Sequence, residues 1–440
     1  MFTKLFSTAL LTGLLISGIN ARAQTTFASA ETMNTKDAPK AAATTTTTVA
    51  PAKQADPVDT SFHPVRRLWG YTFGDFYYAA SADPANRGAE TNYNGVPKYR
   101  NAFQFRRVYL GYDYDITKKF SAELLLEAAP GANTNAAAGT SISNGDNLAD
   151  NKMSFYIKLI NLRYKGIWDG TDFVFGQVST PGFALLSEKI WGYRSIEKTV
   201  ADFHKTNSFD IGAALQGVFD VKTKNFGYDL MIGDNTSASV LPATVGNGFF
   251  KAFYGDVYGK FLDKKLILDI YADYMKTTIT SGIVGPQSHN MIKGFAAYTT
   301  PQLTVGVEAY TNKFKNAVTA TDGTTKTVKD ATAQAISIFA HGQINKDKLG
   351  WFARYDGYQP NTNFNTDEAL NATPISSYNL FTKQRFVTAG LDLSPAKNVH
   401  FMPNVWFVQY KDERDPGTTG YVPDGHSLVY RLTVYFTFGK

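Results

Sequence analysis

Stretches of about ten residues, in which apolar and polar side chains alternate, recur from Arg66 to the end of the chain. In the last stretch, 427–438, every even-numbered position is apolar, while Arg431, Thr433 and Thr437 lie between them. Successive side chains of a β-strand point to opposite faces. Each stretch therefore predicts a strand with one apolar face and one polar face.

The connections between these stretches alternate between short and long. The short ones combine charged residues with Asn, Gly or Pro, as hairpin turns do; they are residues 115–119, 166–170, 220–225, 263–265, 299–302, 345–348 and 394–398. The long ones are residues 81–99, 129–151, 180–206, 236–248, 277–289, 316–330, 359–379 and 411–425.

This alternation distinguishes two all-β architectures. A soluble sandwich has no reason to gather its long loops at one end, whereas a membrane barrel has short periplasmic turns and long outer loops. Aromatic pairs near strand ends, such as Tyr77 and Tyr78, suit the two interfaces of a bilayer. We therefore predict an all-β fold, a transmembrane antiparallel β-barrel of about sixteen strands, with both termini in the periplasm.

The N-terminal part divides into two segments before the barrel, which we expect at 65–440. Residues 1–23 contain Lys4, an apolar stretch and the sequence Ala21-Arg22-Ala23, which together predict a cleaved signal peptide; an uncleaved anchor helix is the alternative. Residues 24–64 are rich in Ala, Thr and Pro, a composition that predicts a disordered periplasmic lead-in. A tether or a peptidoglycan contact is the other interpretation of that segment.

The composition of the chain argues against several classes of function. The chain has no Cys, which excludes thiol chemistry and Cys-based metal sites. The formal charge is +6, and +4 after loss of Lys4 and Arg22, but the basic residues form no clustered stripe and export makes nucleic acid an unsuitable partner. No hydrolase or metalloprotease motif such as G-x-S-x-G or H-E-x-x-H occurs. We therefore expect no enzyme activity and no cofactor.

A barrel of this strand number is too wide for its own side chains to fill, so a water-filled lumen follows. The long connection 180–206, the third outer loop, contains Trp191, Ile190 and Val200, which an exposed loop rarely needs. We expect this loop to fold inward and to constrict the pore; covering the barrel mouth or a neighbouring subunit is the alternative. Its charged residues, which would then set ion selectivity, are Glu188, Lys189, Arg194, Glu197, Lys198, Asp202 and Lys205.

Strand parity also predicts which charged residues face the lumen, although a single β-bulge inverts the parity beyond it. The pore-wall candidates are Arg107, Asp113, Glu123, Glu127, Arg354, Asp356 and Arg431. Further inward acids are expected at Asp210, Asp229, Asp269, Asp273, Glu308 and Asp392. Acids outnumber bases on this wall, so the pattern is not a cationic ladder.

Several segments, in order, resemble the phosphate-selective porin O and P family of outer-membrane porins, especially its Bacteroidota-like branch. They are FQFRRVYLGYDYDITKKFSAELLLE, VFGQVSTPGF, EKIWGYRSIEKTVADFH, SFDIGAALQGVF, GWFARYDGYQPN and AGLDLSPAKNVHFMPNVW. The resemblance implies a sixteen-stranded barrel, a homotrimer and a third loop in the lumen. It also implies anion contacts from inward Arg and Lys, for which Arg107 and the loop-three cations are the counterparts.

The sequence thus predicts an outer-membrane porin through which ions and small hydrophilic solutes diffuse passively. The alternatives are a channel selective for phosphate and other anions or for sugars and amides, and a non-conducting structural or enzymatic barrel. The expected partners are outer-membrane lipid, the barrel-assembly machinery and further copies of the chain.

Overall fold

The computed structural model of the chain describes residues 62–90, 95–129, 155–182, 186–204, 206–234, 251–277, 287–322, 325–363, 373–374, 380–418 and 420–439. All of them belong to one compact unit, Asp59–Lys440. The predicted signal peptide and all but the last three residues of the predicted lead-in lie outside the described residues.

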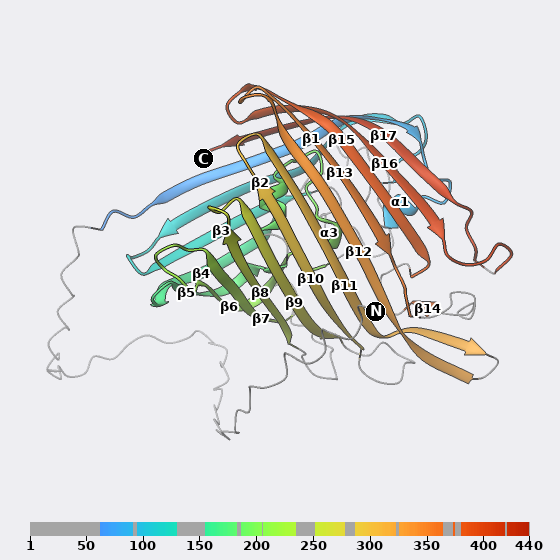
Figure 1. Ribbon diagram of the computed structural model, residues 1–440, viewed down its shortest axis with the longest axis horizontal. Helices are drawn as coiled ribbons and strands as arrows, with labels where there is room; N and C mark the ends of the chain where they lie inside the picture. Colours follow the sequence, from blue (N-terminus) through green and yellow to red (C-terminus); the bar gives the residue numbers. More distant parts are fainter. Residues whose placement is uncertain are drawn as a thin grey trace, which may run out of the picture. The chain divides into compact units, whose positions relative to one another are not determined.

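The unit is a closed antiparallel barrel (Figure 1). Its sixteen long strands are β1 (Arg66–Ser81), β2 (Asn101–Asp115), β3 (Phe120–Ala128), β4 (Phe155–Trp168), β5 (Thr171–Ser179), β6 (Phe209–Val218), β7 (Phe226–Gly233), β8 (Ala252–Phe261), β9 (Leu266–Thr277), β10 (Gln287–Thr299), β11 (Leu303–Asp322), β12 (Thr325–Asn345), β13 (Leu349–Gln359), β15 (Thr382–Ala396), β16 (Val399–Asp412) and β17 (Gly425–Phe438). Each pairs with the next, and β17 pairs with β1, which closes the ring. The predicted fold class and strand number are confirmed.

A seventeenth, very short strand lies apart from this ring. β14 (Thr373–Pro374) pairs with β11 through Val318 and Thr319, near the long-loop end of that strand. β13 pairs directly with β15, so β14 does not interrupt the wall.

One predicted loop is a strand hairpin instead. We expected a long loop at 316–330, but β11 continues to Asp322 and β12 begins at Thr325, with a register shift between Phe314 and Val318. The segment is rich in Thr and Val, which favour strands, and its middle carries the Asp322-Gly323 pair typical of tight hairpin turns. Its polarity indicated a loop, whereas its β-propensity and turn residues extend the two strands.

The two faces of the wall differ as the alternation requires. Outward side chains such as Ile270, Phe175 and Ile292 are 56–67% exposed, whereas their neighbours Tyr271 and Met291 are buried on the inner side. Exposed apolar side chains occur on strands all around the ring, from Phe76 of β1 to Tyr430 of β17. This is the surface that a barrel presents to lipid.

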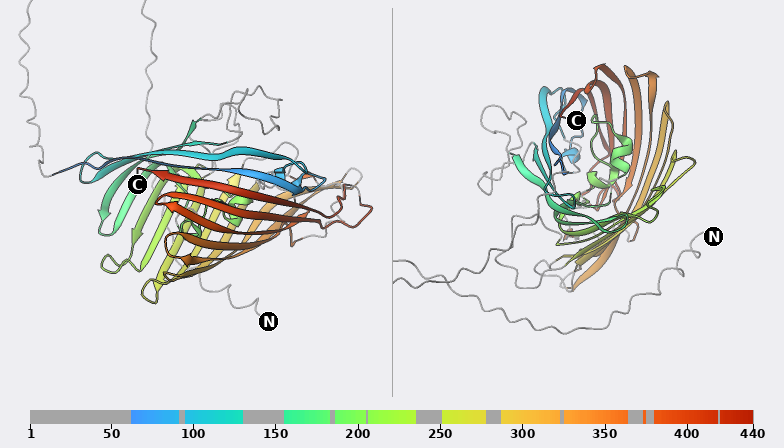
Figure 2. Two further views of the ribbon diagram at one scale, coloured as in Figure 1. Left: turned by 90° about the horizontal axis from the view of Figure 1, so that it is seen from above. Right: turned by 90° about the vertical axis from the view of Figure 1, so that its left-hand side faces the viewer.

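Three short helices belong to the connections: α1 (Arg87–Glu90), α2 (Ser187–Trp191) and α3 (Val200–Phe203). Among the described residues, every helix is too short and too polar to span a bilayer. The end-on view of Figure 2 shows the green segment that carries α2 and α3 inside the ring of strands. The third loop therefore folds inward, as predicted.

Candidate pore constriction

Trp191, at the end of α2, anchors the first half of loop three to the inner wall. Its ring is 2% exposed and lies 5.4 Å from the Phe339 ring of β12 and 5.9 Å from the Phe352 ring of β13, measured between centroids. The indole nitrogen donates to the Ile196 carbonyl at 2.8 Å, and Gly192 ends the helix with a φ of 73°. The apolar residues that suggested an inward loop therefore form its contact with the wall.

A buried ion pair on β13 holds the second half of the loop. Arg354 and Asp356 lie 2.6 Å apart with side chains 2% and 1% exposed, and Arg354 Nη1 donates to the Lys198 carbonyl at 2.7 Å. Both were predicted to line the pore. They lie on the inner face, but beneath loop three, where they support its backbone instead of facing pore water.

His204, directly after α3, adds a third anchor. Nδ1 lies 2.7 Å from the Val200 carbonyl, Nε2 lies 3.2 Å from Gln384 Oε1 of β15, and the ring stacks on Tyr358 at 3.5 Å. Burial lowers the pKa of His204 to about 4. The imidazole is therefore neutral near pH 7 and contributes packing and hydrogen bonds instead of charge.

A β-bulge in β2 turns two consecutive arginines toward the lumen. Phe73 of β1 is opposite Arg107, but the next residue, Gly74, is opposite Phe105, so Arg106 is the extra residue. Phe105 on one side of the bulge is exposed on the outer wall, and Tyr109 on the other side is buried within. The bulge absorbs one residue, so Arg106 and Arg107 both point inward.

Arg106 connects the wall to loop three. Its Nε lies 2.8 Å from Asp75 Oδ2 of β1, its Nη1 lies 2.6 Å from Glu197 Oε2, and its Nη2 donates to the Arg194 carbonyl. Arg431 of β17, another predicted wall residue, contacts the same Asp75 at 2.8 Å with a side chain 1% exposed. These groups form a buried ionic cluster that is structural, because almost none of it is in contact with water.

Arg107 and Lys158 are wall cations close to loop three that stay partly exposed, each with a side chain 21% exposed. They share one carboxylate, since Glu127 Oε1 lies 2.8 Å from Arg107 and its Oε2 lies 2.7 Å from Lys158. Lys158 also sits in a bulge, where Leu126 is opposite Ile157 and Leu125 is opposite Leu159. Two cations and one acid leave a net positive charge at this point of the wall.

Loop three contributes Arg194 to the same region. Its Nη1 lies 2.8 Å from Glu188 Oε1, with the two side chains 17% and 24% exposed, and its guanidinium stacks over the Tyr71 ring of β1 at 5.2 Å. Burial opposes its charge, but the nearby Tyr71 and Glu188 raise the pKa of Arg194. Arg194 is therefore always cationic.

The loop acids respond to this positive field in different ways. Burial disfavours the charged form of Glu197, but Arg106 and Arg107 hold its pKa below the ordinary value. Burial raises the pKa of Asp202, against the opposing effect of Lys198. Glu197 is thus a fixed anion in the cluster, while Asp202 carries its charge less readily.

The remaining predicted residues are not brought into this cluster. Lys189 is exposed on α2, and Lys198 lies over the Phe203 ring at 5.9 Å. Asp113 pairs with Arg67, and Glu123 accepts from Asn161 at 2.9 Å, both in a concavity of about 430 Å³ at the turn end of β1–β4. Lys205 lies outside the described residues. In the described part of the chain, no three His, Asp or Glu side chains come together to hold a metal ion.

Three functional residues were missed in the sequence. Arg106 and Lys158 were not selected because strand parity assigns alternate residues to alternate faces, and bulges break that rule. Asp75 was missed although it follows the regular inward parity of Phe73 and Tyr77. The Arg106-Arg107 doublet was the available signal, since in a regular strand one of two consecutive arginines has to face lipid, which is costly.

Known structures share this architecture. OmpT, an outer membrane protein of Vibrio cholerae in its trimer form, matches with a TM-score of 0.52 at 11% identity, over 85% of this chain and 99% of that one. The outer membrane channel DcaP of Acinetobacter baumannii matches with a TM-score of 0.54 at 10% identity, over 85% of this chain and 97% of that one. The chain thus has the fold of outer-membrane barrels.

At such low identity the likeness shows the fold alone. No protein-family model matches the chain, and neither does any curated protein. The resemblance to the phosphate-selective porins therefore stays a prediction.

Proposed function

We propose that the protein is an outer-membrane porin that lets ions and small hydrophilic solutes diffuse passively through a pore narrowed by loop three. The observation that carries this proposal is the anchoring of loop three, through Trp191, Arg354 and His204, inside a barrel of sixteen strands. A barrel of that size encloses an aqueous channel, and an inward loop fixes its narrowest section. The proposal includes no chemical reaction, because passive diffusion needs only a pore and the anchoring contacts are packing, ion pairs and hydrogen bonds.

We further propose that the pore moderately prefers anions. Three cations, Arg107, Lys158 and Arg194, are partly exposed at the constriction against one partly exposed acid, Glu188. Glu127, which faces the two wall cations, is only 3% exposed on its side chain. Charged side chains at the narrowest section affect permeation most, because the least water separates them from a passing ion. The inward acids of β6 to β11 lie elsewhere on the wall and are largely buried, so they oppose this preference only weakly.

The same proposal includes export and assembly. The signal peptide 1–23 directs the chain out of the cytoplasm, the barrel-assembly machinery inserts it, and three copies form a homotrimer. The trimer form of OmpT of Vibrio cholerae, a similar structure, and the family resemblance support the trimer.

Conductance of the purified mature protein in a planar bilayer tests the proposal. We expect ohmic steps that occur in threes, and a reversal potential of the anion-selective sign in a KCl gradient. Liposomes that contain the protein but stay sealed to small solutes would refute the channel. A cation-selective reversal potential would leave the channel intact but refute the anion preference.

Phosphate, added as a blocker, separates the general channel from the selective one. A general diffusion channel keeps a conductance that rises with salt and is unaffected by millimolar phosphate. Saturation and block by phosphate would favour the phosphate-selective alternative, and block by sugars would favour the sugar-selective one.

A further inference from the structure

A second cluster of cations lies on the opposite surface of the wall, near the long-loop ends of β15 and β16. Lys383 and Arg385 of β15 alternate with Gln384 and Phe386, which are buried on the lumen side. Lys411 of β16 likewise lies between the buried Tyr410 and Asp412. Lys383, Arg385 and Lys411, called here the outer basic cluster, therefore face away from the lumen.

The strand register brings these cations together. Lys383 is directly opposite Lys411, and Arg385 is opposite Gln409. Like charges directly opposite on one face of a sheet repel each other. In the described part of the chain, none of the three forms an ion pair or a hydrogen bond. Glu413, in the same lining, offsets part of this repulsion, because Lys383 and Lys411 both favour its charged form. Two opposed lysines beside Arg385 still suit a bound anionic group.

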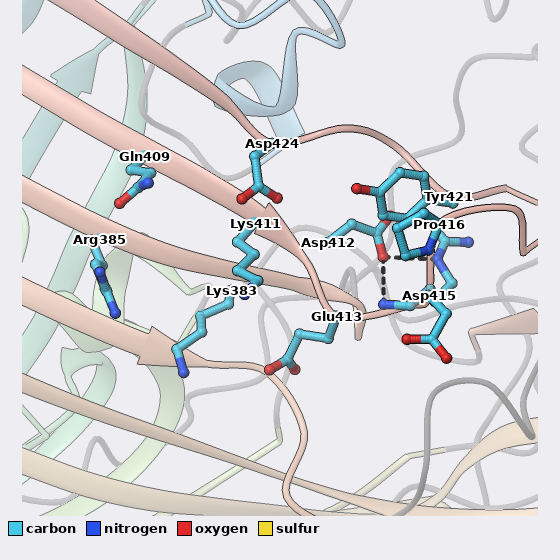
Figure 3. Close-up of a pocket in the computed structure, with 11 residues that line it drawn as sticks. Lys383, Arg385, Gln409, Lys411, Asp412, Glu413, Asp415, Pro416, Tyr421 and Asp424 are labelled. Atoms are coloured by element: carbon cyan, nitrogen blue, oxygen red, sulfur yellow. Dashed lines mark hydrogen bonds and ion pairs between the residues drawn. The ribbon is translucent and has the colours of Figure 1, made fainter.

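The outer basic cluster lines one side of a concavity of about 650 Å³ (Figure 3). The residues after β16 form the other side, among them Glu413, Arg414 and Asp415, and Asp424 completes it. Three of the four acids in the lining, Asp412, Glu413 and Asp415, already take part in interactions. Asp412 Oδ2 lies 2.6 Å from Arg414 Nη2, and Glu413 accepts from Gln359 Nε2 at 2.5 Å. The strands thus contribute three cations, the Gln409 amide and Asp412, whose charge Arg414 already balances.

Next to the outer basic cluster, toward the middle of the barrel, the outward side chains of the strands are apolar. Arg385, Gln409 and His426 form one row across β15, β16 and β17. Two residues further along each strand, Val387, Phe407 and Leu428 form the next row. That step is about 7 Å along a strand. Val387 and Phe407 are 40% and 36% exposed. A ligand that reaches both rows must carry anionic groups beside apolar chains.

We propose that the outer basic cluster binds the phosphorylated headgroup of a glycolipid of the outer leaflet, whose acyl chains lie on the apolar rows below. The long loops mark this end as the external one, so the cluster is at the level of the lipid headgroups on that side. Basic clusters at a membrane boundary bind anionic headgroups in this way. Free inorganic phosphate offers the same anion but none of the apolar contact.

Lipid binding by the purified full-length protein in detergent tests this inference, with native mass spectrometry as the readout. The probes are diphosphoryl lipid A, the same lipid without its phosphates, and inorganic phosphate. We expect the triple variant K383Q/R385Q/K411Q to bind diphosphoryl lipid A at least about tenfold more weakly than the wild type. The control K222Q/K346Q/K397Q removes the same charge from exposed turns at the other end and should bind like the wild type.

Each outcome is decisive. Equal binding by the triple variant and the wild type, or equal binding of the lipid with and without phosphates, overturns the proposal. Displacement of the lipid by millimolar inorganic phosphate would assign the site to the free anion. Loss of the trimer from the triple variant in lipid-free detergent would assign the cluster to contacts between copies. Unchanged single-channel conductance of the triple variant shows that it is folded and keeps this test independent of the proposed channel function.

Discussion

Arg106 and Arg107 are adjacent in β2, yet their environments give them different roles. Arg106 is buried between Asp75 and Glu197, whereas Arg107 reaches pore water beside Glu127. Removing a buried partner leaves other charges uncompensated, which costs about 3–5 kcal/mol, while a partly exposed pair contributes at most about 1 kcal/mol. At the residue scale, we therefore expect Arg106 to affect stability and Arg107 to affect the proposed ion selectivity.

We expect Arg106→Gln to lower the free energy of unfolding by about 3–5 kcal/mol and to make the open-channel current noisier, because loop three loses its link to the wall. Urea unfolding in lipid vesicles, followed by tryptophan fluorescence, measures the first effect. Arg107→Gln, one residue along, is the control and should unfold within about 1 kcal/mol of the wild type. Equal destabilisation by both changes would contradict the assignment of roles.

The double variant R107Q/K158Q should move the reversal potential in a KCl gradient toward cations, because Glu127 then remains without its two partners. Lys346→Gln, at an exposed turn, changes the charge outside the constriction and should leave the reversal potential unchanged. An unaltered potential in the double variant would show that these cations do not face the permeation path.

His204 makes the attachment of loop three depend on pH. Burial lowers its pKa to about 4 in the folded protein, against 6.5 for the ordinary side chain, so the unfolded chain takes up the proton first. The contribution of neutral His204 to the free energy of unfolding is fully present above pH 6.5 and is lost as the pH falls toward 4. At pH 5 the loss is about 2 kcal/mol.

We expect the wild-type channel to show more loop-three fluctuations at pH 5 than at pH 7.5, visible as current noise. His204→Gln removes this titration. The rise in current noise from pH 7.5 to pH 5 should therefore be smaller in the variant, and the difference from the wild type is the part due to His204. The acids Glu197 and Asp202 titrate in both proteins and cancel in that difference. Identical pH dependence in the two would refute the role of His204.

At the scale of elements, an aromatic contact of loop three with the barrel wall adds to its ionic anchors. Trp191→Ala removes a buried ring that meets Phe339 and Phe352, a change that costs about 3–5 kcal/mol in a packed core. We expect larger and less steady conductance, since the loop no longer fixes the narrowest section. Trp168→Ala, at a 50% exposed position beside a turn, is the matched control and should conduct normally.

Strands and turns were predictable because their signals are local. Alternation over 427–438 and turn residues such as those at 394–398 identify a strand or a turn without knowledge of the rest of the chain. The contacts of loop three were not predictable to the same degree. Arg354 lies under Lys198, 156 residues away, and Arg106 reaches the lumen only because of a bulge that leaves no certain mark in sequence.

At the scale of the whole molecule, the apolar outer surface predicts where charge is tolerated. Ile270→Arg, on the 67% exposed outer face of β9, should reduce the free energy of unfolding in vesicles by about 2–4 kcal/mol. Ile344→Arg, 61% exposed beside a turn, should cost about 1 kcal/mol or less, because the chain there is near the interface. Equal small losses would mean that the outer wall does not face lipid.

The bulge in β2 also bears on how such a wall can change in length. A closed ring has no free edge, so one residue added to a regular strand displaces every pairing beyond it. Here the extra residue is confined between Phe105 and Arg107. Deleting Arg106 would restore strict alternation and leave the pairs from Val108 to Tyr114 in place. A cation can therefore be gained or lost by single-codon insertion or deletion at this point, with the ring itself unaltered.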